Sequence, residues 1–160
     1  MYDPAEFRLD DQVALVTGGG AGIGRAIAET FAAAGAKVMV SDLHLQTARA
    51  TADSIRASGG EAGAQACDVT QEEDLASRVS ATVGCFDRLT TVVSNAGGGG
   101  PKPFDMPVAD FRRAFELNVF PLFCLAQLAA PEIGRVGGGS ILVISSMAGE
   151  NKNERMASYG

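Results

Sequence analysis

Short apolar runs alternate along this chain with longer segments of helical periodicity, and this alternation leaves few folds open. The runs are rich in β-branched residues and nearly continuous, as expected of strands covered on both faces. They span residues 12–17, 37–41, 62–67, 89–94 and 140–145. Strands and helices alternating at this length imply right-handed crossovers. We therefore expect an α/β domain of the Rossmann type, with a doubly wound parallel sheet and helices on both faces.

The segments between these runs carry apolar residues at helical spacing. The repeats are Ile23, Ile27 and Phe31; Leu75, Val79 and Val83; and Phe111, Phe115 and Val119. Thr70 and Glu73 have the spacing of a capping box and predict where the second of these helices begins. Pro121 has no N–H to donate to the carbonyl of Leu117, so the last helix should kink there.

Composition limits the class of protein and its partners. The 160 residues, 46% hydrophobic and 20% charged, fit one globular domain over residues 1–160. The acidic start has no apolar leader, and no apolar run approaches the roughly 18 residues of a membrane span, so we expect an unanchored cytoplasmic protein. A net charge of -6 without a Lys/Arg cluster argues against nucleic acid as a partner.

The cysteines and the single histidine do not suggest a metal site. Cys67, Cys85 and Cys124 are widely spaced and form no CxxC pattern. They are interpreted as reduced thiols rather than a disulfide framework or metal ligands. His44 follows the end of a strand and is interpreted as a solvated loop residue.

A glycine-rich turn joins the first strand to the first helix. Its sequence, residues 17–24, is Thr-Gly-Gly-Gly-Ala-Gly-Ile-Gly. Backbone N–H groups and the positive end of the helix could hold a pyrophosphate there. The turn does not fit the generic GxGxxG pattern, because Ile23 occupies the last glycine position when counting from Gly18. Tight packing without a ligand is the alternative.

Asp42 ends the second strand, 18 residues after Gly24. A carboxylate at this place can accept hydrogen bonds from the ribose hydroxyls of a dinucleotide, and it would repel a 2'-phosphate. Neighbouring Leu43 and Ala21 offer no positive charge, so NAD is favoured over NADP. The alternative for Asp42 is an ordinary helix N-cap.

Three further segments complete a pattern. Asp68 and Val69 come at the end of the third strand, Ser94-Asn95-Ala96-Gly97 follows the fourth, and Ser146 and Tyr159 lie 13 positions apart after the fifth. With the glycine turn, these resemble the short-chain dehydrogenase/reductase family. The positions matching the family's cofactor contacts are Gly18, Gly22, Ile23, Gly24, Asp42, Leu43, Asp68, Val69, Asn95, Ala96, Gly97 and Tyr159. The family has Asn where this chain has Ser94.

The resemblance implies a catalytic set of Asn118, Ser146 and Tyr159. Oxidation of a secondary alcohol needs a base as the hydride leaves. A tyrosine, with a usual pKa of about 10, serves only beside positive charge. In the family that charge comes from the nicotinamide and from a lysine four positions after the tyrosine, which would here fall beyond Gly160. The serine holds the substrate oxygen and the asparagine anchors a relay water. Alternatively, Asn118 only satisfies backbone groups left free at the proline kink, and Ser146 and Tyr159 are an ordinary strand-end serine and helix-start aromatic residue without a catalytic role.

Residues 97–107 and 146–153 narrow the resemblance to a subfamily, the bacterial NAD-dependent 7-alpha-hydroxysteroid dehydrogenases. This likeness implies a bile acid or steroid substrate bordered by Gly99, Ser146, Asn151 and Tyr159, and a homotetramer or homodimer for the full-length form. Otherwise Asn151 caps a turn and the glycines only bend it.

Three functions stay open: an NAD-dependent dehydrogenase for this or another secondary alcohol or ketone, a nucleotide-binding module without catalysis, and a Rossmann-like methyltransferase. The last would have no use for the Asn-Ser-Tyr set. We expect the chain to be truncated after the fifth strand, which then becomes an uncovered edge.

Overall fold

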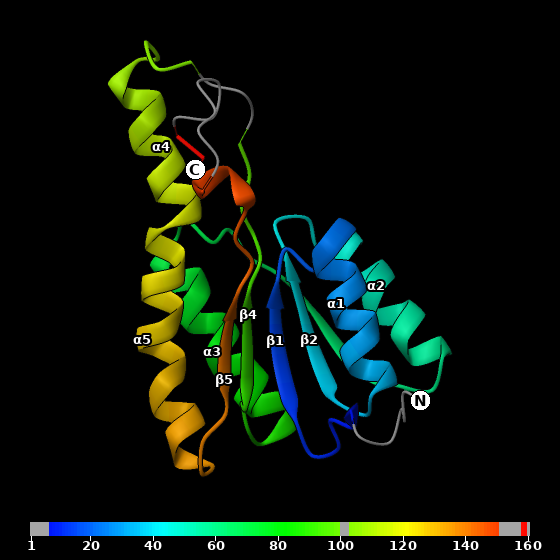
Figure 1. Ribbon diagram of the computed structural model, residues 1–160. Coiled ribbons are helices and arrows are strands. Elements are labelled where there is room, and N and C mark those ends of the chain that lie inside the picture. The colour runs from blue at the N-terminus through cyan, green and yellow to red at the C-terminus, as the bar shows by residue number, and fades with distance from the viewer. Residues whose placement is uncertain (1–6, 100–102, 151–157, 160) are drawn as a thin grey trace.

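The computed structural model describes residues 7–99, 103–150 and 158–159. In this part of the chain, one sheet holds five strands in the order β3-β2-β1-β4-β5 (Figure 1). They are β1 (Val13–Thr17), β2 (Lys37–Asp42), β3 (Glu61–Ala66), β4 (Thr91–Ser94) and β5 (Ser140–Val143). Every neighbouring pair is parallel. The chain therefore builds the sheet outward from β1 in one direction, then returns to build it in the other.

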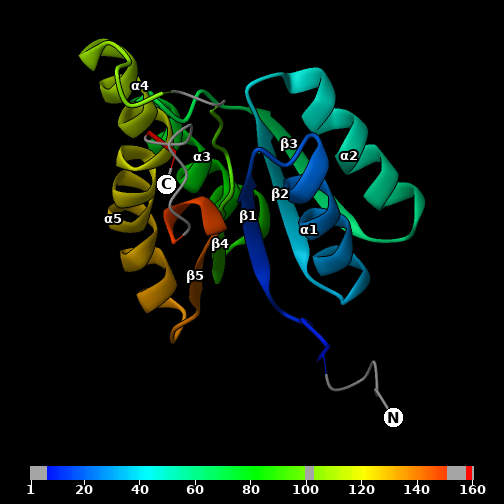
Figure 2. The ribbon, with the colours of Figure 1, turned by 45° about the horizontal axis from the view of Figure 1, so that its top comes forward.

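Helices cover both faces of the sheet. The helices are α1 (Gly22–Ala33), α2 (Leu45–Ala57), α3 (Glu72–Phe86), α4 (Val108–Asn118) and α5 (Phe120–Arg135), with a short 3-10 helix, η2 (Met147–Gly149), after β5. Figure 2 shows α1 and α2 together on one side of the sheet and α3 and α5 on the other. The prediction of a doubly wound parallel sheet of the Rossmann type is confirmed.

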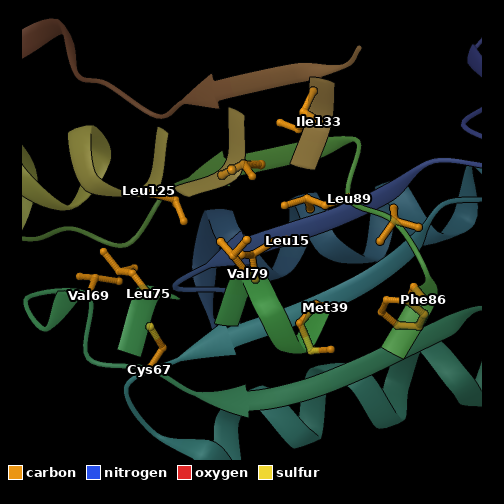
Figure 3. Packing of buried hydrophobic residues seen from close by; sticks show 13 residues of the cluster. Leu15, Met39, Cys67, Val69, Leu75, Val79, Phe86, Leu89, Leu125 and Ile133 are labelled. Carbon is orange, nitrogen blue, oxygen red and sulfur yellow. The ribbon is translucent and has the colours of Figure 1, made fainter. Parts of the chain in front are cut away.

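Two hydrophobic cores result, one on each face. Alternate residues of β1 serve both, because Leu15 packs into the cluster beneath α3 and α5 and Val16 into the cluster beneath α1 and α2. The first cluster contains bulky side chains, among them Leu75, Leu89 and Leu125 (Figure 3). The second is rich in alanine: Ala28, Ala32, Ala36, Ala48, Ala52 and Ala62. Small side chains let helices lie close to the sheet.

The predicted capping box at the start of α3 is wrong. The helix begins at Glu72 after Gln71, and no side chain caps it. The hydroxyl of Thr70 instead donates to Oδ1 of Asp68 at 2.7 Å, and the backbone N–H of Thr70 donates to the same oxygen at 3.0 Å. A carboxylate two residues upstream forms this local turn and so takes the hydroxyl away from the helix end.

The predicted kink near Pro121 is a break between two helices. α4 ends at Asn118 and α5 begins at Phe120, with Pro121 in its first turn. Within the described residues, the helical stretch Val108–Arg135 contains an 18-residue window with a mean hydropathy of 1.3, so by length and composition alone it could cross a membrane. This stretch is not one continuous apolar run, because Asn118, Gln127 and Glu132 interrupt it. The signal is weak by itself, because helices of soluble cores also satisfy it.

β5 differs from the other strands in its exposure. All five residues of β1 are buried, whereas all four residues of β5 are exposed. β5 pairs with β4 along one edge and lies at the end of the described sheet. Its apolar side chains therefore meet solvent on the described surface.

Candidate active site

A cavity of about 660 Å³ opens at the carboxyl ends of β1, β4 and β5. The helices that follow β1 and β4 lie on opposite faces of the sheet, so this is the switch point where α/β sheets bind ligands. The lining residues predicted from the sequence are Gly18, Gly22, Ile23, Gly24, Asp42, Asn95, Ala96, Gly97, Asn118, Ser146 and Tyr159. The fold thus gathers segments more than 100 residues apart along one hollow, whose size is typical of ligand pockets.

The glycine turn needs glycine for two different reasons. Gly18 and Gly22 have φ of +62° and +53°, which residues with a side chain rarely adopt. At Gly24 the limit is space, since a Cβ atom would lie 2.2 Å from the carbonyl oxygen of Gly18 and 2.4 Å from Nδ2 of Asn95. The turn is therefore closed tightly against the end of β4.

The start of α1 has the features of an anion site. Its N-cap is Ala21, which provides no side-chain cap, and its first turn holds no acidic residue. Free N–H groups and the helix dipole favour a phosphate at such an end. A Cβ atom at Gly22 would meet no atom within 4 Å, and Gly22 lines the cavity. The residues present thus fit a bound pyrophosphate.

Asp42 is held by three donors. Its Oδ1 accepts from the backbone N–H of His44 at 3.1 Å and from the hydroxyl of Thr47 at 3.0 Å. Its Oδ2 accepts from the backbone N–H of Gly20 at 3.0 Å. The N-cap residue of α2 is His44, not Asp42. The carboxylate is thus tied to the glycine turn and faces the cavity.

The remaining residues predicted to contact the cofactor lie at the edge of the main cavity or outside it. Ile23 and Leu43 are large apolar side chains left 63% and 61% exposed, free to cover a ligand. Asp68 lies beside the local turn with Thr70. Val69 is buried in the core and lines a separate cavity of about 180 Å³. Leu43, Asp68 and Val69 are outside the lining of the main cavity.

Asn95 links β4 to β1 and the turn. Its Nδ2 donates to the carbonyl oxygens of Thr17 at 2.9 Å and Gly18 at 3.2 Å. The hydroxyl of Thr17, itself buried, accepts from the backbone N–H groups of Asn95 and Ala96 at 3.1 Å each. Asn95 therefore fixes the floor of the cavity. The sequence reasoning named Thr17 only as part of the turn and missed this clamp, because its partners lie 78 and 79 residues away.

Asn118 binds the segment after β4. Its Oδ1 accepts from the backbone N–H of Gly98 at 3.0 Å, and its Nδ2 donates to the carbonyl oxygens of Gly98 at 3.0 Å and Ala114 at 2.9 Å. The side chain thus joins the end of α4 to the loop behind β4. It lines the cavity while making these contacts.

Ser146 and Tyr159 both line the cavity. Ser146 is exposed, and its Oγ accepts from the backbone N–H of Ala148 at 3.2 Å, so it caps η2. Tyr159 is 37% exposed and borders Gly99, where a Cβ atom would come within 3.0 Å of its ring. Gly99 therefore leaves space for the tyrosine ring. Asn151, the other predicted substrate contact, lies outside the described residues.

Charge is sparse in this site. Among the described residues that line the cavity, Asp42 is the one charged side chain, and it lies at the turn end, away from the Ser146 and Tyr159 segment. In the described part of the chain, His, Cys, Asp and Glu residues form no group that could hold a metal ion. The residues that line the cavity can bind an organic ligand and transfer a proton.

Comparison with known proteins gives relatives over nearly the whole chain. The 7alpha-hydroxysteroid dehydrogenase of Escherichia coli is 53% identical over 99% of this chain and 62% of its own length. A 2,5-dichloro-2,5-cyclohexadiene-1,4-diol dehydrogenase of Sphingobium indicum is 37% identical over 95% of this chain and 61% of its own length. The chain thus spans about three fifths of these curated relatives.

A solved structure agrees with these relatives. It is a 7 alpha-hydroxysteroid dehydrogenase in complex with NADH and 7-oxo glycochenodeoxycholic acid, with a TM-score of 0.95 and 53% identity, covering 99% of this chain and 62% of that one. The sequence also matches the short chain dehydrogenase family over residues 12–160. The chain belongs to the short-chain dehydrogenase/reductase family of oxidoreductases.

Proposed function

We propose that this chain carries the cofactor site and catalytic residues of an NAD-dependent dehydrogenase for the 7-alpha hydroxyl of a bile acid or related steroid. The observation that carries the proposal is the single cavity shared by the glycine turn, Asp42, Asn118, Ser146 and Tyr159. A cofactor held along it would extend from the ribose carboxylate toward the tyrosine. NAD supplies a hydride acceptor when bound there.

Residues of the turn end would bind the adenosine half of the cofactor. The uncapped start of α1 would hold the pyrophosphate, and Asp42 would accept hydrogen bonds from the ribose. None of the described residues that line the cavity is positively charged, and Asp42 is negative. The Asp42 carboxylate would therefore repel a 2'-phosphate. NAD is therefore the cofactor that this charge pattern favours.

The other end of the cavity would perform the proton transfer. Ser146 would hold the substrate oxygen by a hydrogen bond, and Tyr159 would remove the hydroxyl proton as general base. Asn118, fixed by Gly98 and Ala114, would keep the neighbouring loop in place and could orient a relay water. The positive charge that a tyrosinate needs would come from the oxidised cofactor and from the lysine that the family places four residues later.

We infer that residues 1–160 form one domain within a longer, cytoplasmic enzyme that assembles as a homodimer or homotetramer. Two observations support the longer enzyme: the chain spans 62% of the length of its Escherichia coli relative, and β5 exposes apolar side chains where a buried strand would be expected. The rest of the enzyme would cover β5 and close the substrate end of the site.

Turnover by the full-length enzyme tests this function. With NAD, it should oxidise cholate, which has a 7-alpha hydroxyl, and should leave its 7-beta epimer unchanged. Activity on ring alcohols without activity on cholate would instead support a dehydrogenase like the Sphingobium relative, whose name gives a cyclohexadiene diol as substrate. Absence of NADH binding would refute both versions.

A further inference from the structure

The carboxylate of Asp42, proposed to bind the ribose, is held in part by a side chain of α2. The hydroxyl of Thr47, in the first turn of α2, lies 3.0 Å from Oδ1 of Asp42. It also lies 2.7 Å from the carbonyl oxygen of His44. A hydroxyl has a single proton and can donate fully to only one of the two.

The carboxylate is the better acceptor for that proton. The carbonyl oxygen of His44 already receives the backbone N–H groups of Thr47 at 3.1 Å and Ala48 at 3.2 Å. The carboxylate is charged, and hydrogen bonds to charged acceptors are roughly twice as strong as neutral ones. Thr47 therefore donates to Asp42, which gains a third donor beside the N–H groups of Gly20 and His44.

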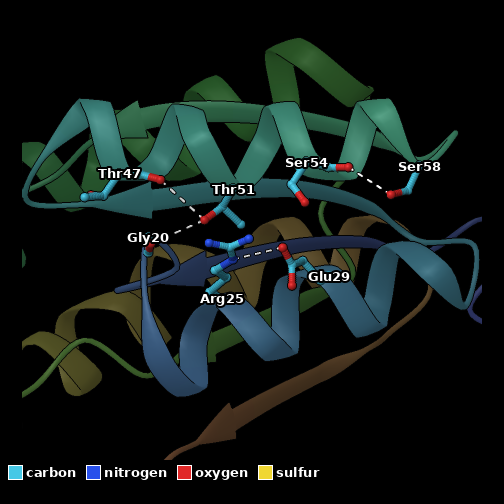
Figure 4. A network of polar contacts seen from close by, with 7 residues as sticks. All are labelled: Gly20, Arg25, Glu29, Thr47, Thr51, Ser54 and Ser58. Carbon is cyan, nitrogen blue, oxygen red and sulfur yellow. Dashed lines mark hydrogen bonds and ion pairs between the residues drawn. The ribbon is translucent and has the colours of Figure 1, made fainter.

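The same threonine packs against the glycine turn. A Cβ atom at Gly20 would lie 2.5 Å from Oγ1 of Thr47 and 2.8 Å from Oδ2 of Asp42. One turn later, the buried hydroxyl of Thr51 lies 3.4 Å from the carbonyl oxygen of Gly20 (Figure 4). Turn, carboxylate and helix thus form one packed unit in which the carboxylate has little freedom to rotate.

We propose that Thr47 is a positioning residue that sets the preference for NAD over NADP by holding the Asp42 carboxylate toward the ribose position. This inference rests on the proposed function. A carboxylate has about four acceptor sites, and three donors already occupy Oδ1 twice and Oδ2 once. One site on Oδ2 is left for a ribose hydroxyl. Without Thr47 the carboxylate would rotate more easily. Its hydrogen bond to the ribose would then be weaker, and it could move away from the 2'-phosphate of NADP.

The test compares Thr47→Val, which keeps the shape and removes the hydroxyl, with Thr47→Ser, which keeps the hydroxyl. Dissociation constants of NADH and NADPH are measured by calorimetry on the full-length enzyme. Thr47→Val should bind NADH about fivefold more weakly and NADPH no more weakly, so that the ratio of the two constants falls about fivefold or more. Thr47→Ser should keep the parent ratio. Thr47→Ala serves in place of the valine variant if that protein does not fold.

A double-mutant cycle shows whether Thr47 acts through the carboxylate. Asp42→Ala should reduce the discrimination further than Thr47→Val, and adding Thr47→Val to Asp42→Ala should change the ratio no more. Thr82→Val is the matched control, because the buried hydroxyl of Thr82 donates only along its own helix, to the carbonyl oxygen of Arg78 at 2.7 Å. It should leave both dissociation constants unchanged.

The outcomes separate this inference from the proposed function. A parent enzyme that binds neither nucleotide refutes the function, and the inference with it. A parent that prefers NADH, with the same ratio in Thr47→Val, refutes the role of Thr47 alone. Equal weakening of NADH and NADPH in Thr47→Val, or loss of the ratio in Thr47→Ser, also refutes it, because general loosening of α2 would explain either result.

Discussion

Tyr159 borders the cavity with its ring against Gly99. In the proposed mechanism its hydroxyl oxygen, once deprotonated, removes the proton of the substrate hydroxyl. Removing that hydroxyl leaves the ring packing intact and deletes the base. Tyr159→Phe in the full-length enzyme should therefore lower kcat at least ~100-fold, the smaller effect expected for general acid–base catalysis. The dissociation constant of NADH should change little.

Steady-state kinetics with cholate and a calorimetric NADH titration check this result. Ser146→Ala is the useful companion variant, because the loss of a hydroxyl that orients the substrate should also lower turnover. A phenylalanine variant that retains near-parental kcat would place the base on another residue.

The cysteines differ in burial, and this gives a second prediction for single side chains. Burial raises the pKa of the Cys67 thiol, which is only 3% exposed, whereas Cys85 is exposed. Only the thiolate reacts with disulfide reagents. At pH 8 in the native protein, Cys85 should be modified first and Cys67 only on unfolding, as peptide mass mapping would show. Equal native rates would contradict the burial of Cys67.

The same raised pKa has a consequence for stability. A folded-state pKa above the unfolded value of about 8.5 means that, between the two, the folded chain retains a proton that the unfolded chain has lost. The contribution of Cys67 to stability is thus complete below about pH 8.5 and declines as pH rises through the folded pKa. Denaturant unfolding of Cys67→Ala should show a shallower alkaline decline than the parent protein.

The strand-to-helix turn depends on Gly24 for space rather than for backbone angle. In Gly24→Ala the new methyl would lie 2.2 Å from a carbonyl oxygen of the turn, and forced overpacking typically costs about 1–3 kcal/mol. We expect the unfolding free energy to fall by at least that much and NADH to bind more weakly. Urea unfolding and calorimetry measure the two effects.

Gly84→Ala is the matched control for this turn. Gly84 lies in α3, and a Cβ atom there meets nothing within 4 Å, so the variant should gain up to about 1 kcal/mol from helix propensity. If Gly24→Ala were as stable as the parent, the close approach of the turn to β4 would be misjudged.

Elements were largely predictable from the sequence, because strand and helix periods depend on local patterns. The five strands and the helices marked by Ile23, Leu75 and Phe111 occur within a few residues of their predicted places. Contacts between distant residues were not predictable. Thr17 clamps Asn95, and Asn118 binds Gly98, but no spacing rule identifies partners 78 or 20 positions away. Even the prediction of a local capping box was wrong, because the hydroxyl of Thr70 donates to the carboxylate of Asp68 instead of capping the helix.

The two cores and the open edge determine how the molecule as a whole behaves. Hydrophobic cores cover both faces of the sheet around β1. At β5 the sheet is more exposed, and Ile141, Leu142 and Val143 are 36%, 39% and 49% accessible to solvent. An exposed apolar edge strand is a template for pairing with another chain. In the full-length enzyme we expect the residues beyond this stretch to cover that edge.

Residues 1–160 expressed alone should therefore self-associate through β5. They should also bind NAD weakly and lack dehydrogenase activity, because the part of the enzyme that closes the substrate end of the site would be absent. Light scattering at matched concentrations should show association in this fragment and none beyond the native oligomer in the full-length enzyme. Leu142→Lys places a charge on the edge strand and should reduce the association. Ala57→Lys adds the same charge at the exposed end of α2. If both lysines reduced scattering equally, net charge rather than the β5 edge would be responsible.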